Sequence, residues 1–196
     1  MARPRKQEKK QILAAAWELF RVQGYEASSI KHIERATGQK AGSLYNDFGS
    51  KQGLMAQAVE AYIVDVVRPR IEKHLLDPDP LNGIRQLFLS TFNEQAPEIR
   101  GCLLTNTATE FANTKGEVSA AVTRGFGELR AGFEKACARA QEMGMATKVL
   151  PPQRAADFLL LGYQGILVLA RANHSSDDLC NSVEVILQSL QKEPAV

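Results

Sequence analysis

The stretch IKHIERATGQKAGSLYNDFGSK, residues 30–51, decides the fold. It is rich in helix formers, but Thr37-Gly38-Gln39 interrupts it, and glycine is unfavourable in the middle of a helix. The pattern predicts two short helices joined by a tight turn, the second over residues 40–48. Leu44 and Phe48 are four positions apart, so both face the core and leave the other face of that helix polar.

Helices are also predicted on both sides of this stretch. The spacing of three and four between apolar residues ends at Gly24, Ser28 or Ser29 caps the helix that follows, and Ser50 caps a fourth. Proline and glycine clusters separate the later segments, and no strand pattern is convincing. We therefore predict an all-α fold of about nine helices, over residues 7–23, 30–36, 40–48, 51–76, 81–96, 101–114, 116–143, 152–172 and 176–191.

Charge is unevenly distributed along the 196 residues. The net charge is +2, yet residues 1–53 hold ten Lys and Arg against five Asp and Glu, and the other 143 residues hold fourteen against seventeen. A basic segment attached to a slightly acidic body is typical of proteins that bind nucleic acid, although many solvated helices carry a similar charge.

The composition also indicates the cellular compartment of the protein. No unbroken apolar run reaches the roughly 18 residues of a membrane span, and the N-terminus lacks the pattern of a signal peptide. We therefore expect a cytoplasmic protein that has no membrane partner. The cysteines, Cys102, Cys137 and Cys180, fit neither a disulfide framework nor a zinc site, so they are expected to be free thiols.

Two short helices joined by a glycine-containing turn, with a third helix before them, form the plan of a helix-turn-helix domain. The second helix of such a pair lies in the major groove of DNA. Ser43 and Asn46 are short groups that can bond base edges or phosphates, and Gly42 lets the backbone approach closely. Tyr45 and Lys51 have the reach for phosphate oxygens. The alternative is a plain three-helix domain whose polar face is only solvated.

A more specific pattern runs through the first 51 residues. It consists of Ile12-Leu13, Phe20, Gly24-Tyr25, Ser28-Ser29-Ile30, Ile33, Ala36, Gly38, Lys40-Ala41-Gly42-Ser43-Leu44-Tyr45, Phe48 and Ser50-Lys51. In spacing and identity this segment resembles the DNA-binding domain of the TetR family of one-component transcriptional regulators. The resemblance implies a homodimeric repressor in which residues 1–50 read a palindromic operator. It also implies that residues 51–196 dimerise and bind a small-molecule or thiol-reactive effector.

The resemblance assigns DNA contacts by position. The residues it places against phosphates, the groove or the DNA backbone are Ser28, Ser29, Lys40, Ala41, Gly42, Ser43, Tyr45 and Lys51, and the polar face of the second helix adds Asn46. Asp47 stands where the family usually has a Tyr or His that touches phosphate, so we expect this carboxylate to turn away or to hold a basic neighbour. The basic tail of residues 3–6 is expected to be disordered in the free protein, with entry into a minor groove as the alternative.

Residues 152–172 are apolar on more than one face, around the small residues Gly162 and Gly165. A helix of this kind must be covered on all sides, which predicts that a second copy of the chain covers it. The residues of the next helix predicted to join this four-helix dimer interface are Leu179, Val183, Ile186, Leu187 and Leu190. The alternative is burial within one chain.

The effector pocket is expected among the middle helices. Its predicted lining residues are Phe88, Phe92, Cys102, Asn106, Phe111, Phe126 and Phe133. This composition suits an apolar or aromatic small molecule, although the same residues would also serve as plain core. Cys102 follows Gly101 at a predicted helix start, where the helix dipole favours a thiolate, so it is also a candidate sensor of oxidants or electrophiles. An inert, buried thiol is the alternative.

Other classes of function have little support. His32, His74 and His174 lack the spacing of metal ligands on a helix. Gly125 and Gly127 fall within a predicted helix, without the strand that a dinucleotide site requires. No metal, cofactor or enzyme activity is therefore predicted. The remaining rival is an architectural DNA-binding protein without an effector, which would bind most duplexes alike.

Overall fold

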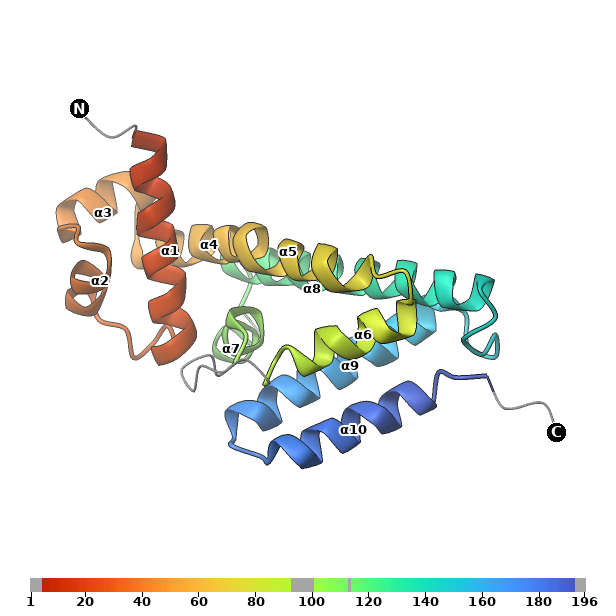
Figure 1. The fold of residues 1–196 in the computed structure, drawn as a ribbon. Coiled ribbons are helices and arrows are strands. Elements are labelled where there is room, and N and C mark those ends of the chain that lie inside the picture. Colours follow the sequence, from red (N-terminus) through yellow and green to blue (C-terminus); the bar gives the residue numbers. More distant parts are fainter. Residues whose placement is uncertain (1–4, 93–100, 113, 193–196) are drawn as a thin grey trace. The chain divides into compact units, whose positions relative to one another are not determined.

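The computed structural model describes residues 5–92, 101–112 and 114–192, and within these ranges the chain is helical, with no strand (Figure 1). The all-α prediction is confirmed. The helices are α1 (Arg5–Gln23), α2 (Ile30–Thr37), α3 (Ala41–Phe48), α4 (Lys51–Tyr62), α5 (Arg68–Arg70), α6 (Pro80–Leu89), α7 (Leu103–Glu110), α8 (Glu117–Glu142), α9 (Pro152–Arg171) and α10 (Ser176–Gln188). Two π-helical turns, η1 (Ile63–Val67) and η2 (Ile71–Leu75), continue α4 and α5 without a break.

The chain forms two compact units. The first comprises the described residues up to Val66 together with Cys102–Gly125, and the second comprises those of Val67–Gly101 and Phe126–Val196. This division differs from a boundary at residue 50, because α4, α7 and the first part of α8 pack with the three N-terminal helices.

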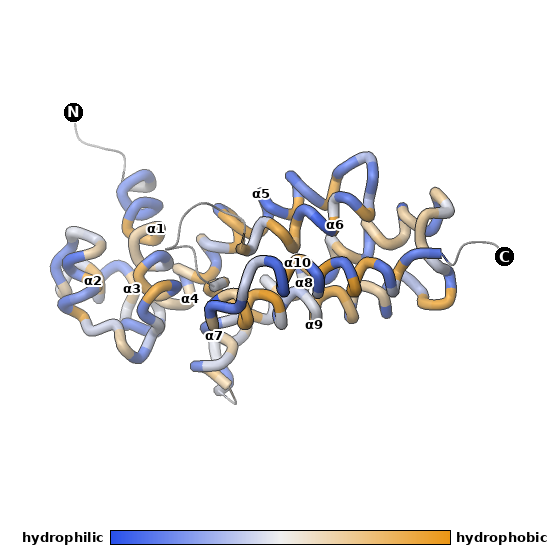
Figure 2. Tube along the Cα trace, turned by 60° about the horizontal axis from the view of Figure 1, so that its bottom comes forward, coloured by the Kyte–Doolittle hydropathy of each residue, from blue (hydrophilic) through white to orange (hydrophobic). Residues whose placement is uncertain are grey.

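The first unit is built on one apolar core. Its helices are amphipathic, with hydrophobic and hydrophilic residues alternating along the chain (Figure 2). The core side chains include Ile12, Ala16, Phe20, Ile33, Leu44, Phe48, Leu54, Ala58, Tyr62, Leu103 and Leu104. Gly24 at φ +86° and Gly38 at φ +70° end α1 and α2 in the left-handed conformation that favours glycine.

The second unit surrounds an aromatic cluster. Phe88 of α6, Phe133 of α8 and Tyr163 of α9 have ring centroids 5.3 to 6.0 Å apart. A Cβ on Gly162 would lie 2.9 Å from Ile186 Cδ1, so this glycine lets α10 approach α9 closely. Along the described parts of the chain, no helix has both the length and the apolar character needed to cross a bilayer.

Some helix ends differ from the prediction for identifiable reasons. The helix predicted over residues 81–96 ends at Leu89, because the hydroxyls of Ser90 and Thr91 donate to the carbonyls of Leu87 and Phe88. Residues 93–96 lie outside the described residues. The helix predicted over 51–76 continues to Leu75 through π turns on both sides of Pro69, whose ring cannot fit a regular α-helix interior.

Candidate DNA-binding site

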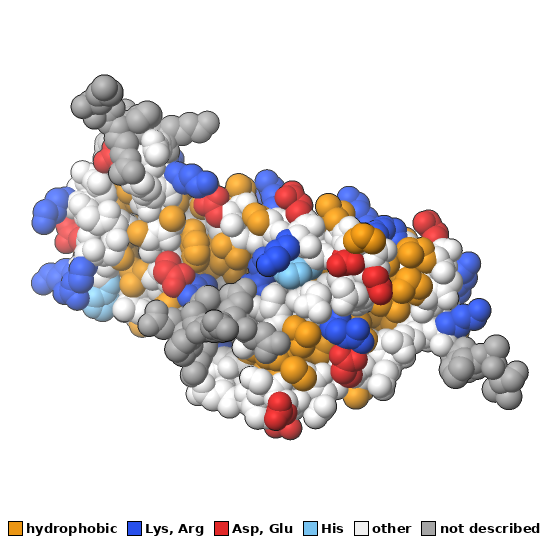
Figure 3. Space-filling view, in the orientation of Figure 1, with side chains coloured by type: hydrophobic (Ala, Val, Ile, Leu, Met, Phe, Trp, Pro, Cys, Tyr) orange, Lys and Arg blue, Asp and Glu red, His pale blue; other side chains and the backbone are white. Residues whose placement is uncertain are grey.

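Helix α3 is fixed by two apolar anchors and is polar elsewhere. Leu44 is 2% exposed and Phe48 is 6% exposed. The outward residues of the helix are Gly42, Ser43, Tyr45, Asn46 and Asp47, and all are exposed. Lys and Arg side chains stand out over the neighbouring surface of α2 and α3 (Figure 3). The face that the sequence assigned to the major groove is therefore available to a partner.

The turn before α3 is held by its own polar groups. Ser29, rather than Ser28, caps α2, since its hydroxyl accepts the His32 backbone N–H at 3.3 Å. The Glu34 carboxylate accepts the Ala41 N–H at 2.8 Å and so caps the start of α3. Lys40 is the N-cap residue of α3 and does not lie within the helix, and its side chain is exposed.

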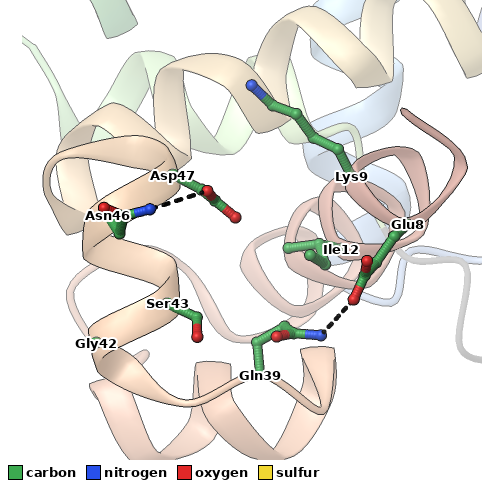
Figure 4. Close-up of a pocket in the computed structure, with 8 residues that line it drawn as sticks. All are labelled: Glu8, Lys9, Ile12, Gln39, Gly42, Ser43, Asn46 and Asp47. Atoms are coloured by element: carbon green, nitrogen blue, oxygen red, sulfur yellow. Dashed lines mark hydrogen bonds between the residues drawn. The ribbon is translucent and has the colours of Figure 1, made fainter. Parts of the chain in front are cut away.

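A hollow of about 790 Å³ lies between α1 and α3 (Figure 4). Gln39 Nε2 donates to Glu8 Oε1 at 3.3 Å across it. Asp47 lines the hollow together with Lys9 and accepts a bond from Asn46 Nδ2 at 3.5 Å. The sequence pattern does not point to Glu8 or Gln39, because the two residues are 31 positions apart.

Ser28 has an internal role. Its side chain is 0% exposed, and its hydroxyl donates to the Gly24 carbonyl at 2.6 Å, which ties the loop between α1 and α2. A bond from this hydroxyl to a phosphate would require the loop to open. The Ser28 hydroxyl is therefore engaged within the unit and is not proposed as a DNA contact.

Lys51 begins α4 and lies over an aromatic ring. Its Nζ is 4.1 Å from the centre of the Tyr25 ring, a cation–π distance. Burial raises the pKa of Tyr25, so its phenol stays neutral at physiological pH. Lys9 lies 5.2 Å over the Phe48 ring in the same way. Both ammonium groups are thus held at the surface of the helix-turn-helix unit.

The predicted effector residues are divided between the two units. Cys102, Asn106 and Phe111 belong to the first. Phe88, Phe92, Phe126 and Phe133 belong to the second, where Phe88 and Phe133 are fully buried and contact each other. Phe92 and Phe126 are half-buried.

Cys102 is the N-cap residue of α7, and it is 7% exposed. The Tyr62 hydroxyl donates to its sulfur at 3.6 Å, and Tyr62 packs edge-on against Trp17 at 5.3 Å. Further along α7, Asn106 Nδ2 donates to the Arg21 carbonyl at 3.0 Å. These contacts join α7 to α1 and α4 within the first unit. Within the described residues no cluster suited to a metal ion is found.

Two family models match the chain. "Bacterial regulatory proteins, tetR family" matches residues 12–58, and "Tetracyclin repressor-like, C-terminal domain" matches residues 80–185. The chain belongs to the TetR family. It is thus a DNA-binding transcriptional regulator of the repressor type, and it is not an enzyme.

Similar TetR-family proteins span nearly the whole chain. The transcriptional repressor DhaR of Mycobacterium sp. (strain GP1) is 26% identical and covers 88% of this chain and 87% of its own length. The repressor ComR of Escherichia coli K12 is 25% identical, with 90% and 86% covered. The regulator CifR, solved as a cysteine mutant with 26-base-pair operator DNA, is 27% identical with a TM-score of 0.77, covering 95% and 99%.

In this TetR-family chain, α9 presents an apolar face to solvent. Leu161 is 74% exposed and Val168 is 52% exposed, and Phe158 and Leu169 lie on the same helix at 39% and 38%. On α10 the exposed apolar residue is Val185, at 65%.

The residues in and just after α10 that were predicted for a dimer interface are mostly buried within the chain itself. Those buried are Leu179, Val183, Leu187 and Leu190, and Ile186 is half-buried. That part of the prediction is corrected, because α10 turns this face toward its own unit.

Proposed function

We propose that the protein represses transcription as a homodimer that reads a palindromic operator in the bacterial cytoplasm. The observation that carries this proposal is α3, a helix anchored by Leu44 and Phe48 whose outward face is polar and exposed. Such a helix fits the major groove, and two copies related by a twofold axis read two half-sites. The apolar face of α9 supports the pairing of two chains, since exposed patches of this kind are typical of interfaces.

The proposed contacts are made by exposed residues together with Ala41 and Lys51, which are half-buried. Lys40, Ala41, Gly42, Ser43 and Asn46 face the bases. Ser29, Tyr45 and Lys51 are proposed to contact phosphates.

The test is selection of duplexes from a random pool, followed by affinity measurements on the selected site and on a scrambled duplex. The wild-type chain should bind the selected site far more tightly than the scrambled duplex. Ser43→Ala and Asn46→Ala should each lower discrimination by about 1 to 3 kcal/mol where the group reads a base. Thr123→Ala, an exposed position on α8 of the same unit, is the matched control and should change nothing. A wild-type chain that binds both duplexes alike would instead support an architectural protein.

We further propose that an effector acting on the helical body lowers operator affinity. A coupling free energy of about 1 to 3 kcal/mol is usual for such linkage. An apolar ligand in the second unit is proposed to contact Phe88, Phe92, Phe126 and Phe133. In the first unit, an effector that binds or reacts at α7 is proposed to involve Cys102, Asn106 and Phe111. Cys102 is supported by its place at the α7 start and its contact with Tyr62, which belongs to the helix run that begins at Lys51.

The thiol route has a direct test. Modification of Cys102 by an electrophile, verified by mass spectrometry, should weaken operator binding in the wild-type chain. A Cys102→Ser variant should keep its affinity after the same treatment. Unchanged affinity of a wild-type chain with Cys102 fully modified would leave only the ligand route.

A further inference from the structure

Glu110, the last residue of α7, holds the loop between α1 and α2. Its carboxylate accepts the backbone N–H of Tyr25 at 2.8 and 3.1 Å and that of Glu26 at 2.9 Å. These bonds link positions 84 and 85 residues apart, and α7 lies beside the C-terminal end of α1 (Figure 1). A carboxylate that accepts two successive amides makes stronger bonds than a neutral acceptor would.

Gly24 has no side chain and so leaves room for this carboxylate. It has φ +86°, and a Cβ at this position would lie 2.9 Å from Glu110 Oε1. The glycine therefore provides both the left-handed turn and the space for Glu110. The carboxylate also opposes attraction of DNA, since it adds negative charge to the unit that contains the basic segment of residues 1–53.

The clamped residue, Tyr25, supports a proposed phosphate contact. Its ring packs against Phe111 at 4.8 Å and Phe20 at 6.0 Å, and the Lys51 ammonium lies over it at 4.1 Å. Glu110 holds the Tyr25 backbone, and the Tyr25 ring holds Lys51. A displacement of Tyr25 would thus release the ammonium from its position.

We propose that Glu110 is a positioning residue for operator binding, which acts through Tyr25 to orient Lys51 toward a DNA phosphate. The inference rests on the proposed function, because it requires that the helix-turn-helix unit binds an operator. It gives α7 a defined part in that function, since the last residue of this helix, Glu110, binds the loop that precedes α2.

The test uses the full-length chain, its selected operator and the variant Glu110→Gln, with Glu110→Ala as a second variant. Simple electrostatics predicts tighter DNA binding when a carboxylate is removed. The clamp predicts the opposite, an operator affinity lowered about tenfold by the loss of charged hydrogen bonds. The slope of log K against log salt should also become shallower by about 0.9 for each phosphate that the variant no longer neutralises. Glu142→Gln, an exposed glutamate at the end of α8, is the matched control.

A Lys51→Ala background separates positioning from general loss of structure. If Glu110 acts through Lys51, then Glu110→Gln should cost little once Lys51 is gone. Additive losses, an unchanged salt slope, or an affinity equal to or above wild type would overturn the inference. A wild-type chain without operator preference would remove the proposed function itself, whereas normal wild-type binding with an unaffected Glu110→Gln variant would remove only the role of Glu110.

Discussion

Trimming Leu161 to alanine should weaken the homodimer strongly. Full burial of a leucine side chain is worth about 1.5 to 3 kcal/mol. Leu161 is 74% exposed in the single chain, so about three-quarters of that, or roughly 1 to 2 kcal/mol, remains for an interface on α9. Because a twofold dimer contains the substitution twice, the expected loss is about 2 to 4 kcal/mol, or about 30- to 700-fold in the dimer dissociation constant.

Sedimentation velocity over a range of protein concentrations measures this change. Leu76→Ala is the matched control, since Leu76 is 65% exposed but follows η2 and is not on α9 or α10. Circular dichroism should report the same helix content for both variants, because neither side chain is buried within the chain. If Leu161→Ala dimerises as tightly as Leu76→Ala, the assignment of the apolar face of α9 to the interface is refuted.

Three further outcomes test internal packing. Ser28→Ala should lower the free energy of unfolding by about 1 to 3 kcal/mol in denaturant melts, because the Gly24 carbonyl loses a buried partner, while operator preference stays unchanged. Burial raises the pKa of the Cys137 thiol from 9.0 to about 12, so ionisation favours the unfolded chain between these pH values. Between these pH values the free energy of unfolding of the wild-type chain should fall by about 1.4 kcal/mol per pH unit relative to that of Cys137→Ala. Parallel pH dependences of the two free energies would contradict this. Gly125→Ala should destabilise the fold by about 1 to 3 kcal/mol, since its Cβ would meet Leu104 at 2.6 Å, whereas Gly127→Ala on the same helix meets nothing and should stabilise it.

The helices were predictable because their signals are local. The Gly38 turn, the Ser50 cap and the pair Leu44 and Phe48 are set by residues within one or two turns of each other, and the structure agrees with each. The polar face of α3 followed from the same pattern. Where the prediction of a helix end was wrong, as at Leu89, the cause was side-chain competition for carbonyls that apolar spacing does not report.

Contacts between residues far apart in the sequence were not predictable from one sequence. Apolar spacing identifies which face of α10 is buried, but it does not say whether the same chain or a second copy covers it, and Leu187 was assigned to the wrong neighbour. The Glu110 clamp has no sequence signal either, since a glutamate at a helix end 85 residues from Tyr25 looks like an ordinary solvated residue. Ser28 shows a third limit, because the resemblance assigned it a DNA contact while the loop uses its hydroxyl internally.

The composition of α3 makes dimerisation matter for specificity as well as affinity. Ala41 and Gly42 offer no side-chain hydrogen bonds, so in the proposed complex each copy of the helix would read bases with few groups, chiefly Ser43 and Asn46. A good base contact discriminates by about 1 to 3 kcal/mol, and two copies on one operator add their contributions. Phosphate contacts such as that proposed for Lys51 raise affinity for every duplex equally. Weakening the α9 interface should therefore lower the affinity for the operator more than it lowers the affinity for random DNA.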